Sequence, residues 1–264
     1  MASIRRNEET VTATIEQHSA GTRGRNIAVA VPVVAIGIIV PAIAFVVLSV
    51  VGLVLGLVLT AVATIVRVRT FGTATDRRIV DAFTTMPAES VPAAAGFRNL
   101  AAGLGASIGV EVDDLRVLDD PGCNLLVVDD GKGHPVVVVT TGMLAALSRV
   151  ELEGVVARAL VQIRQGDAAA VVDELAMDRA PDIKVVRSLI GGPSVLDDPD
   201  RDVLLDRAAV AVTRYPPGLL GALEVCRRSG TAVAGADPAT TPLWIVDPSG
   251  AASLDERIEV LGLL

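Results

Sequence analysis

Hydrophobic and polar positions divide the chain into three stretches of different character. Residues 1–26 are polar and show no periodicity, residues 27–66 contain no charged residue, and from Thr70 onward short apolar groups alternate with polar turns. These patterns predict a flexible tail over 1–26, an apolar segment over 27–66 and a folded domain over 70–264.

The apolar segment is too long for one membrane helix. At about 1.5 Å per residue, a single helix over 27–66 would be about twice as long as the hydrocarbon layer of a bilayer is thick. We therefore expect a hairpin of two transmembrane helices, with its turn between Pro41 and Gly52. One strongly tilted or broken helix is the alternative.

Arginines flank the apolar segment on both sides, at positions 23 and 25 and at positions 67 and 69. Positive charge favours the cytoplasmic side of a membrane, and a hairpin places both flanks there. The pattern predicts that residues 27–66 contact the lipid bilayer of an inner or plasma membrane. The tail and the domain over 70–264 would then lie in the cytoplasm.

Beyond the apolar segment the pattern predicts a mixed, mostly helical domain with a small sheet. Apolar runs bounded by Asp-Asp-Pro-Gly at 119–122 and Asp-Asp-Gly-Lys-Gly at 129–133 are typical of strands. The expected strands are Leu115–Leu118, Leu125–Val128 and Val136–Val139. The expected helices include one with Ile79, Phe83 and Met86 on one face, which Pro87 ends, and one over Val91–Ile108. The fold class is therefore α+β.

The clearest element is a helix expected from Ser148 to Gly166. Ser148 and Glu151 have the spacing of a capping box, which satisfies backbone donors at a helix start. Apolar residues then recur every three or four positions and predict one buried face. Arg158 and Gln162, four residues apart, lie together on the flank of that face.

Composition narrows the functional classes. The 264 residues carry a net charge of -8, which argues against a nucleic-acid-binding protein because such proteins need a basic face. Cys123 and Cys226 lack the spacing of a metal or redox motif, so we expect two lone buried thiols in a reducing compartment.

The sequence around Arg158, Val-Ala-Arg-Ala-Leu-Val-Gln-Ile, resembles the metal-binding helix of the HtpX-type and CAAX-processing membrane zinc metalloproteases. Segments 117–124 and 138–144 resemble a strand-and-turn motif and an edge strand of the same family. The resemblance covers residues 27–264 and implies a zincin-like domain behind the membrane hairpin. Arg158 then stands at the first zinc-binding His, Ala159 at the general-base Glu and Gln162 at the second His.

Further matches lie downstream of this helix. Asp202-Val-Leu-Leu-Asp206 resembles the Glu-x-x-x-Asp motif that carries the third zinc ligand of the family. Asp202 would occupy the ligand position, one methylene shorter than Glu, and Asp206 would match a carboxylate that orients a histidine. Val246-Asp247-Pro248 resembles a Thr-His-Pro motif whose His is absent here.

These exchanges remove the chemistry that the family uses. A guanidinium has no lone pair to donate to zinc, and Ala159 cannot accept a proton from a metal-bound water. We therefore predict no metal and no cofactor. The two histidines, His18 in the tail and His134 before Pro135, are not expected to be ligands.

We expect the guanidinium of Arg158 to replace the metal by pairing with Asp206, Asp202 or both, because a buried carboxylate pair without a cation is costly. The alternative is that Arg158 extends along the helix flank to solvent.

The sequence thus favours a catalytically inactive, membrane-anchored pseudoprotease that binds or scaffolds an unidentified membrane or cytoplasmic protein. The expected binding edge is the substrate strand of the family, here Val136, Val137, Val138, Val139 and Thr140, since strand addition needs no zinc. The alternative is an active membrane metalloendopeptidase with a non-standard site.

Overall fold

The structure is a computed structural model that describes residues 34–43, 50–70, 73–112, 114–179, 194, 198–250 and 254–264. The predicted tail over 1–26 lies outside these ranges. The chain divides into two compact units. One contains Met1–Ala74 and Ala176–Ser194, and the other contains Thr75–Leu175 and Val195–Leu264.

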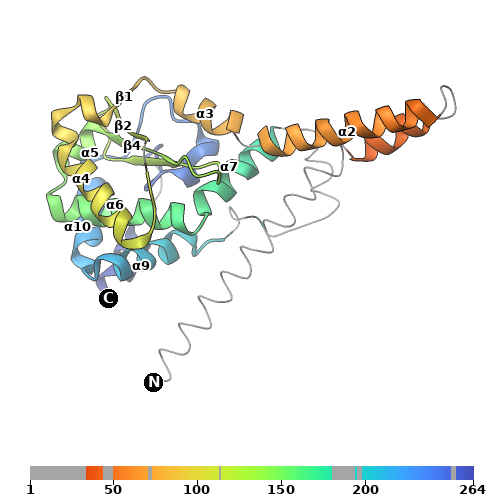
Figure 1. The fold of residues 1–264 in the computed structure, drawn as a ribbon. Helices are drawn as coiled ribbons and strands as arrows, with labels where there is room; N and C mark the ends of the chain where they lie inside the picture. Colours follow the sequence, from red (N-terminus) through yellow and green to blue (C-terminus); the bar gives the residue numbers. More distant parts are fainter. Residues whose placement is uncertain are drawn as a thin grey trace. The chain divides into compact units, whose positions relative to one another are not determined.

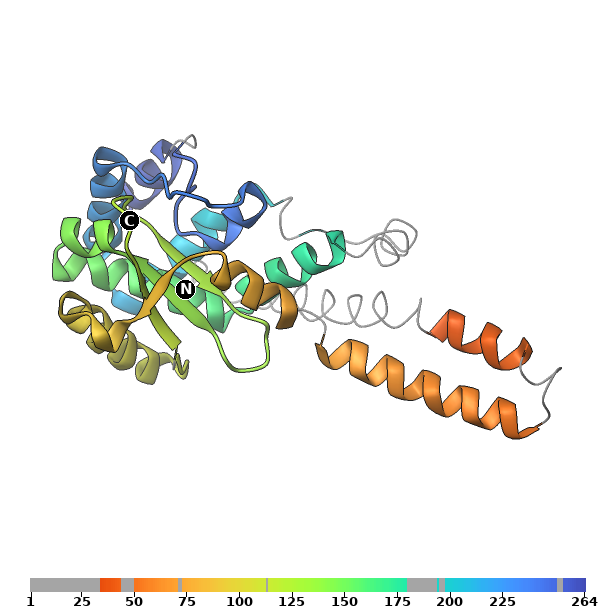
Figure 2. The same ribbon diagram turned by 90° about the horizontal axis from the view of Figure 1, so that it is seen from above.

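The N-terminal unit contains two helical stretches, one over 34–43 and the other, α2, over Val50–Thr70. Figure 2 shows them side by side. Their backbones approach closely at glycines: a Cβ on Gly37 would lie 1.9 Å from Thr60 Cγ2, and one on Gly56 would lie 3.1 Å from Pro41 Cγ. Gly56 thus serves packing within the hairpin.

The hairpin exposes its large apolar side chains. Residues such as Ile36 and Leu59 are 63% and 62% exposed. In the part of the chain that the structure describes, no helix has the length and apolarity needed to cross a membrane.

The second unit begins within α3 (Thr73–Asp81), which ends earlier than its apolar spacing predicts. The predicted helix through Met86 is wrong, because Thr85–Pro87 forms strand β1. Pairing with β2 outweighs the helical spacing of Ile79, Phe83 and Met86. Two 3-10 turns, η1 (Ala88–Ser90) and η2 (Pro92–Ala94), then lead into α4 (Ala95–Ile108), which Gly109 closes at φ 72°.

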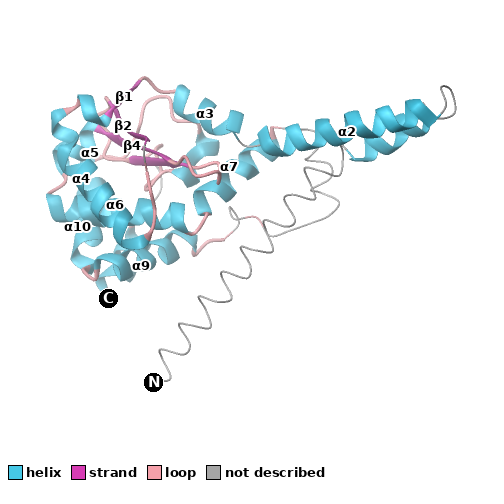
Figure 3. Cartoon of the chain, in the orientation of Figure 1, coloured by secondary structure: helices cyan, strands magenta, loops and turns pink. Residues whose placement is uncertain are grey.

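A small mixed sheet follows, coloured magenta in Figure 3. Its strands are β1, β2 (Asp114–Leu118), β3 (Leu125–Val128) and β4 (Val136–Thr140), in the order β1-β2-β4-β3. β4 runs parallel to β2 and antiparallel to β3, while β1 is antiparallel to β2. The three strands predicted from the sequence are present, and the α+β class is confirmed.

The predicted partner-binding edge is wrong. Val136, Val137, Val138, Val139 and Thr140 form β4, which is hydrogen-bonded on both sides, by β2 and by β3. Four of its five residues are buried. The family resemblance suggested an edge strand here, but β4 lies between β2 and β3, so it has no free edge for a peptide strand.

Further helical segments follow β4 along the chain. They are α5 (Thr141–Ala146), α6 (Arg149–Arg164), α7 (Asp167–Asp178), α9 (Arg201–Thr213), α10 (Pro216–Ser229), η4 (Pro238–Leu243) and α11 (Asp255–Gly262). Figure 1 shows α6 between the sheet and α9, and α6 also contacts α4 and α10. Gly154 permits the contact with α10, since a Cβ there would lie 2.6 Å from the backbone nitrogen of Leu219.

The segment over 230–248 is fixed to the sheet by Asn124. The amide nitrogen of this fully buried side chain donates to the carbonyls of Thr231 at 3.0 Å and Val246 at 2.8 Å. Ile245 N donates to Leu125 O at 2.9 Å, so the segment also continues the pairing at the outer side of β3. This attachment places the carbonyl of Pro242 beside Gln162 of α6 and that of Ile245 beside Arg257 of α11.

A candidate site on helix α6

The middle of helix α6 is buried all round rather than on one face. Ser148 and Glu151 form the predicted capping box, with Ser148 N donating to Glu151 Oε2 at 2.7 Å. Every residue from Gly154 to Gln162 is buried. A polar side chain on this stretch must therefore find its hydrogen-bond partners inside the protein.

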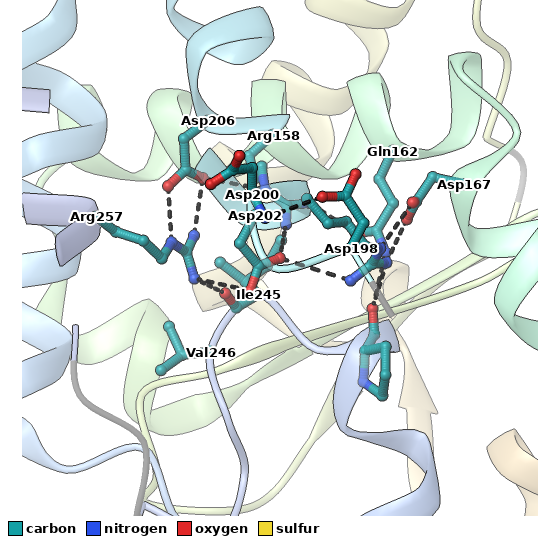
Figure 4. Close-up of polar contacts among 12 residues, drawn as sticks. Arg158, Gln162, Asp167, Asp198, Asp200, Asp202, Asp206, Ile245, Val246 and Arg257 are labelled. Atoms are coloured by element: carbon teal, nitrogen blue, oxygen red, sulfur yellow. Dashed lines mark hydrogen bonds and ion pairs between the residues drawn. The ribbon is translucent and has the colours of Figure 1, made fainter. Parts of the chain in front are cut away.

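Arg158 finds three such partners, as Figure 4 shows. Its Nε donates to Asp206 Oδ1 at 3.1 Å, its Nη1 to Gln162 Oε1 at 2.9 Å and its Nη2 to Asp202 Oδ1 at 2.8 Å. The side chain is 0% exposed. Arg158 therefore lies inside the domain and contacts both carboxylates that the family resemblance placed near it, instead of extending to solvent.

Asp206, which is 1% exposed, is shared by two guanidinium groups. Besides Arg158, Arg257 of α11 donates to it twice, from Nε to Oδ2 at 2.7 Å and from Nη2 to Oδ1 at 2.8 Å. The remaining nitrogen of Arg257, Nη1, donates to Ile245 O at 2.7 Å. A bidentate pair of this kind fixes both orientation and charge.

A second ion pair adjoins the first. Arg201 Nε donates to Asp167 Oδ1 at 2.8 Å, and Arg201 Nη2 donates to Asp167 Oδ2 and, at 2.7 Å, to Pro242 O. Gln162 Nε2 donates to the same carbonyl at 3.2 Å. Three arginines thus meet three aspartates and the formal charges balance. The arginine cluster, as we call it, comprises Arg158, Gln162, Asp167, Arg201, Asp202, Asp206 and Arg257.

Burial and neighbouring charge act against each other in the arginine cluster. Burial lowers the pKa of Arg158 from its ordinary value while Asp202 and Asp206 oppose that effect; a guanidinium nevertheless stays charged in proteins. Burial alone would raise the pKa of Asp202, but Arg158, Arg257 and Arg201 outweigh it and hold that pKa below its usual value. For Arg257, burial alone would lower the pKa, but Asp206 and Asp202 together outweigh it and raise that pKa.

Asp202 is where the arginine cluster meets solvent. Its side chain is 43% exposed, whereas those of Arg158 and Asp206 are closed off from water. Arg201 Nη1 and Arg257 Nη1 lie 3.6 and 3.8 Å from its two oxygens. The guanidinium groups of Arg158, Arg201 and Arg257 therefore all lie within 4 Å of Asp202, the carboxylate of the arginine cluster that is exposed to water.

These residues do not suit a zinc ion. Zinc needs imidazole, thiolate or carboxylate donors with free lone pairs, and Asp202 and Asp206 already accept from arginines. Arg158 would repel a dication. Within the described ranges, no group of three or more His, Cys, Asp or Glu side chains is arranged to hold a metal ion.

The other predicted positions lie apart from the polar contacts. Ala159 is buried in the apolar core at 1% exposure. Asp247, the counterpart of the missing His, accepts from Ser249 N at 2.8 Å in a local turn. His134 is exposed, and His18 lies outside the described residues.

Three members of the arginine cluster were not predicted from the sequence, namely Asp167, Arg201 and Arg257. A signal for the two arginines does exist. Arg201 lies four residues before the buried Leu205, and Arg257 lies four residues before the buried Leu261. That spacing places each arginine on the buried face of its helix, where it needs an anion.

The known proteins that this chain resembles carry the same name. The chain is 29% identical over 181 residues to a "Protease HtpX homolog" of Dictyoglomus turgidum and 30% identical over 181 residues to one of Dictyoglomus thermophilum. Each match covers 57% of this chain and 60% of the relative. A homolog of the same name from Limosilactobacillus reuteri is 27% identical over 201 residues, covering 58% of this chain and 67% of the relative.

The chain thus spans about 60% of the length of the two Dictyoglomus relatives. No protein-family profile and no solved structure matches it. The agreement among these relatives nevertheless supports the resemblance to the HtpX family that the sequence motifs suggested.

Proposed function

We propose that this chain is a catalytically inactive member of the HtpX family, with a zincin-like domain whose metal is replaced by Arg158. The observation that carries the proposal is the set of three hydrogen bonds from the buried guanidinium to Gln162, Asp202 and Asp206. A permanent cation thus holds the carboxylates that the resemblance assigns to zinc binding and histidine orientation.

Among the residues that the structure describes, the arginine cluster also offers no proton acceptor suited to hydrolysis. The position that the resemblance assigns to the general base is Ala159, and the three aspartates of the arginine cluster all accept from guanidinium groups. An ion-paired carboxylate is a weak base because the cation favours its charged form. The arrangement is suited to stabilising the domain rather than to activating water.

We further propose that the hairpin anchors the chain in a bacterial inner or plasma membrane. The uncharged run over 27–66 and the exposed apolar side chains of the two helical stretches support this, because water is a poor solvent for such a surface. Flanking arginines favour a cytoplasmic position for the domain.

The first experiment measures zinc content and peptidase activity of the purified full chain in mild detergent. We expect neither bound zinc nor turnover of an unfolded protein substrate. The matched variants install family residues: Ala159→Glu, Gln162→His and Asp202→Glu together, with and without Arg158→His. Zinc binding is expected only when Arg158 is also exchanged, while circular dichroism checks that both variants fold.

Stoichiometric zinc with chelator-sensitive turnover in the unmodified chain would support the second candidate, an active metalloendopeptidase with a non-standard site, and refute the first. Zinc binding by the variant that keeps Arg158 would show that the guanidinium is not what excludes the metal.

A protein-binding role completes the proposal, and β4 is not its surface, because both of its edges are paired. Gentle extraction from membranes followed by mass spectrometry tests this role. A stoichiometric partner that is lost when the hairpin is deleted would support it. Recovery of lipid and chaperones alone would count against it.

A further inference from the structure

The two cysteines, which the sequence predicted to be isolated thiols, lie together. Cys123 belongs to the loop between β2 and β3, and Cys226 belongs to α10, 103 residues further along the chain. Their sulfur atoms are 2.7 Å apart, and the residues are 0% and 1% exposed. Two thiols from distant parts of the chain are thus in direct contact inside the core.

Backbone contacts on both sides fix this pair. Cys123 N donates to the carbonyl of Gly230, the residue that ends α10, at 2.8 Å. The next residue of the loop, Asn124, holds the carbonyls of Thr231 and Val246. A Cβ on Gly122 would lie 2.1 Å from Ala232 O, so the two segments approach as closely as backbone allows. The sulfur contact therefore follows from main-chain packing, not from two flexible side chains.

We propose that Cys123 and Cys226 form a reversible dithiol–disulfide site that reacts with low-molecular-weight disulfides of the glutathione class. One cysteine thiolate attacks the small disulfide, releases one small thiol and forms a mixed disulfide. The second cysteine thiolate attacks the protein sulfur of that mixed disulfide and releases the other small thiol. Two protein S–H bonds and one small S–S bond break, one protein S–S bond forms, and the two protons leave with the two small thiols.

The bond would join the sheet to the helical layer. It would tie the loop over 119–124 to α10, next to the segment over 230–248 whose carbonyls at Pro242 and Ile245 accept from the arginine cluster. Closing a loop of about a hundred residues removes much entropy from the unfolded chain. The oxidised protein should therefore be the more stable form, whether or not the proposed loss of the metal site is correct.

Burial makes the reaction slow in the native state. The hydrogen bond with Cys123 and burial both raise the pKa of the Cys226 thiol, which suppresses the reactive thiolate. Exchange should then proceed through local opening of the loop, so oxidation should be faster under mildly destabilising conditions than in plain buffer.

The test equilibrates the full chain in detergent with mixtures of reduced and oxidised glutathione, both natively and in partly denaturing urea that is then removed. We expect intact mass to fall by two hydrogen atoms, and peptide mapping to recover 123 and 226 in one cross-linked fragment. The midpoint of thermal unfolding should rise by about 10 °C in the oxidised form. Cys123→Ala and Cys226→Ala should each abolish the redox dependence of that midpoint.

The comparison within each variant, oxidised against reduced, keeps the test valid if a substitution itself lowers stability. Full alkylation of both thiols after the most oxidising equilibration in urea would overturn the proposal. So would a disulfide between two chains in place of the internal one. Zinc content plays no part in either outcome, so failure here is distinct from failure of the proposed function.

Discussion

The hairpin and the arginine cluster invert the usual distribution of residue types. Apolar residues such as Ile36 and Leu59 are more than 60% exposed in the hairpin, whereas Arg158 and Asp206 are 0% and 1% exposed in the domain. The contrast teaches that residue type alone does not decide burial. Available partners decide it: each buried charge of the arginine cluster has an opposite charge beside it. We propose that the exposed hairpin surface meets a non-aqueous neighbour.

The arginine cluster and the hairpin differ in how their free energy depends on single residues. Moving an ion out of water costs several kcal/mol, and its opposite charge and hydrogen bonds must offset that cost in full. The arginine cluster is therefore sensitive to loss of a single member. For the exposed hairpin, the free energy of leaving water scales with the total apolar area, at roughly 25 cal/mol per Å². No single methyl group therefore decides its environment.

Asp206→Ala should produce the largest effect, because it leaves the guanidinium groups of Arg158 and Arg257 without their shared buried anion. We expect a loss of about 3–5 kcal/mol in the free energy of unfolding. Urea denaturation of the full chain in detergent, followed by circular dichroism, measures it.

A matched control exists in the same unit. Asp255 accepts from Arg227 at 2.8 Å, but the two side chains are 75% and 48% exposed. Asp255→Ala should cost about 1 kcal/mol or less, as exposed pairs do. Equal losses of unfolding free energy for Asp206→Ala and Asp255→Ala would mean that burying an ion pair does not make its removal more costly.

The hairpin side of the contrast is tested by placing a charge on it. Val58, 53% exposed in α2, becomes Arg in the variant, and a central arginine disfavours membrane insertion by about 2.5–3.5 kcal/mol. We expect the variant to shift from the membrane fraction to the carbonate-soluble fraction. Val150→Arg, at a 47% exposed position of the domain, is the control and should not change the distribution. An unchanged Val58→Arg distribution would contradict membrane anchoring.

Close packing around α6 provides a third, smaller effect. Gly154→Ala places a Cβ 2.6 Å from Leu219 N and should cost about 1–3 kcal/mol, because backbone cannot move aside cheaply. Gly103→Ala in α4 meets nothing within 4 Å and should stabilise by up to about 1 kcal/mol through helix propensity. Thermal unfolding compares the two; a neutral Gly154→Ala would mean that α6 and α10 can separate without loss.

The features that the sequence predicted well are local ones. The capping box at Ser148, the strand over 125–128 and the helix end at Gly109 each depend on residues within a few positions. The pairing of Arg158 with α9 was anticipated only through the family resemblance, which supplied the long-range placement of Asp202 and Asp206. That Arg158 replaces a metal stays a prediction.

The features that were missed depend on distant parts of the chain. β4 lies between β2 and β3 in the sheet, and this order was not predicted from the residues of the strand. Cys123 and Cys226 meet across 103 residues, so their spacing carried no motif. Arg257 was not singled out from the sequence, although its distance from Leu261 places it on the buried face of its helix.

Acid titration gives the smallest and most specific test of the arginine cluster. Arg158, Arg257 and Arg201 outweigh burial and keep the pKa of Asp202 below its ordinary value. Its contribution to stability is therefore present above the unfolded-state value of about 3.9 and is lost as the pH falls through the folded-state pKa. Because the side chain is 43% exposed, solvent screening limits that contribution to about 1 kcal/mol.

Asp202→Asn should accordingly flatten the fall in unfolding free energy below about pH 4. Asp129 has the opposite pH dependence, because burial raises its pKa. Its contribution to the free energy of unfolding is lost as the pH rises through its folded-state pKa. Asp129→Asn should therefore leave the acid limb of Asp202 intact and improve stability slightly near neutral pH. If Asp202→Asn left the acid limb unchanged, the three arginines would not be acting on that carboxylate.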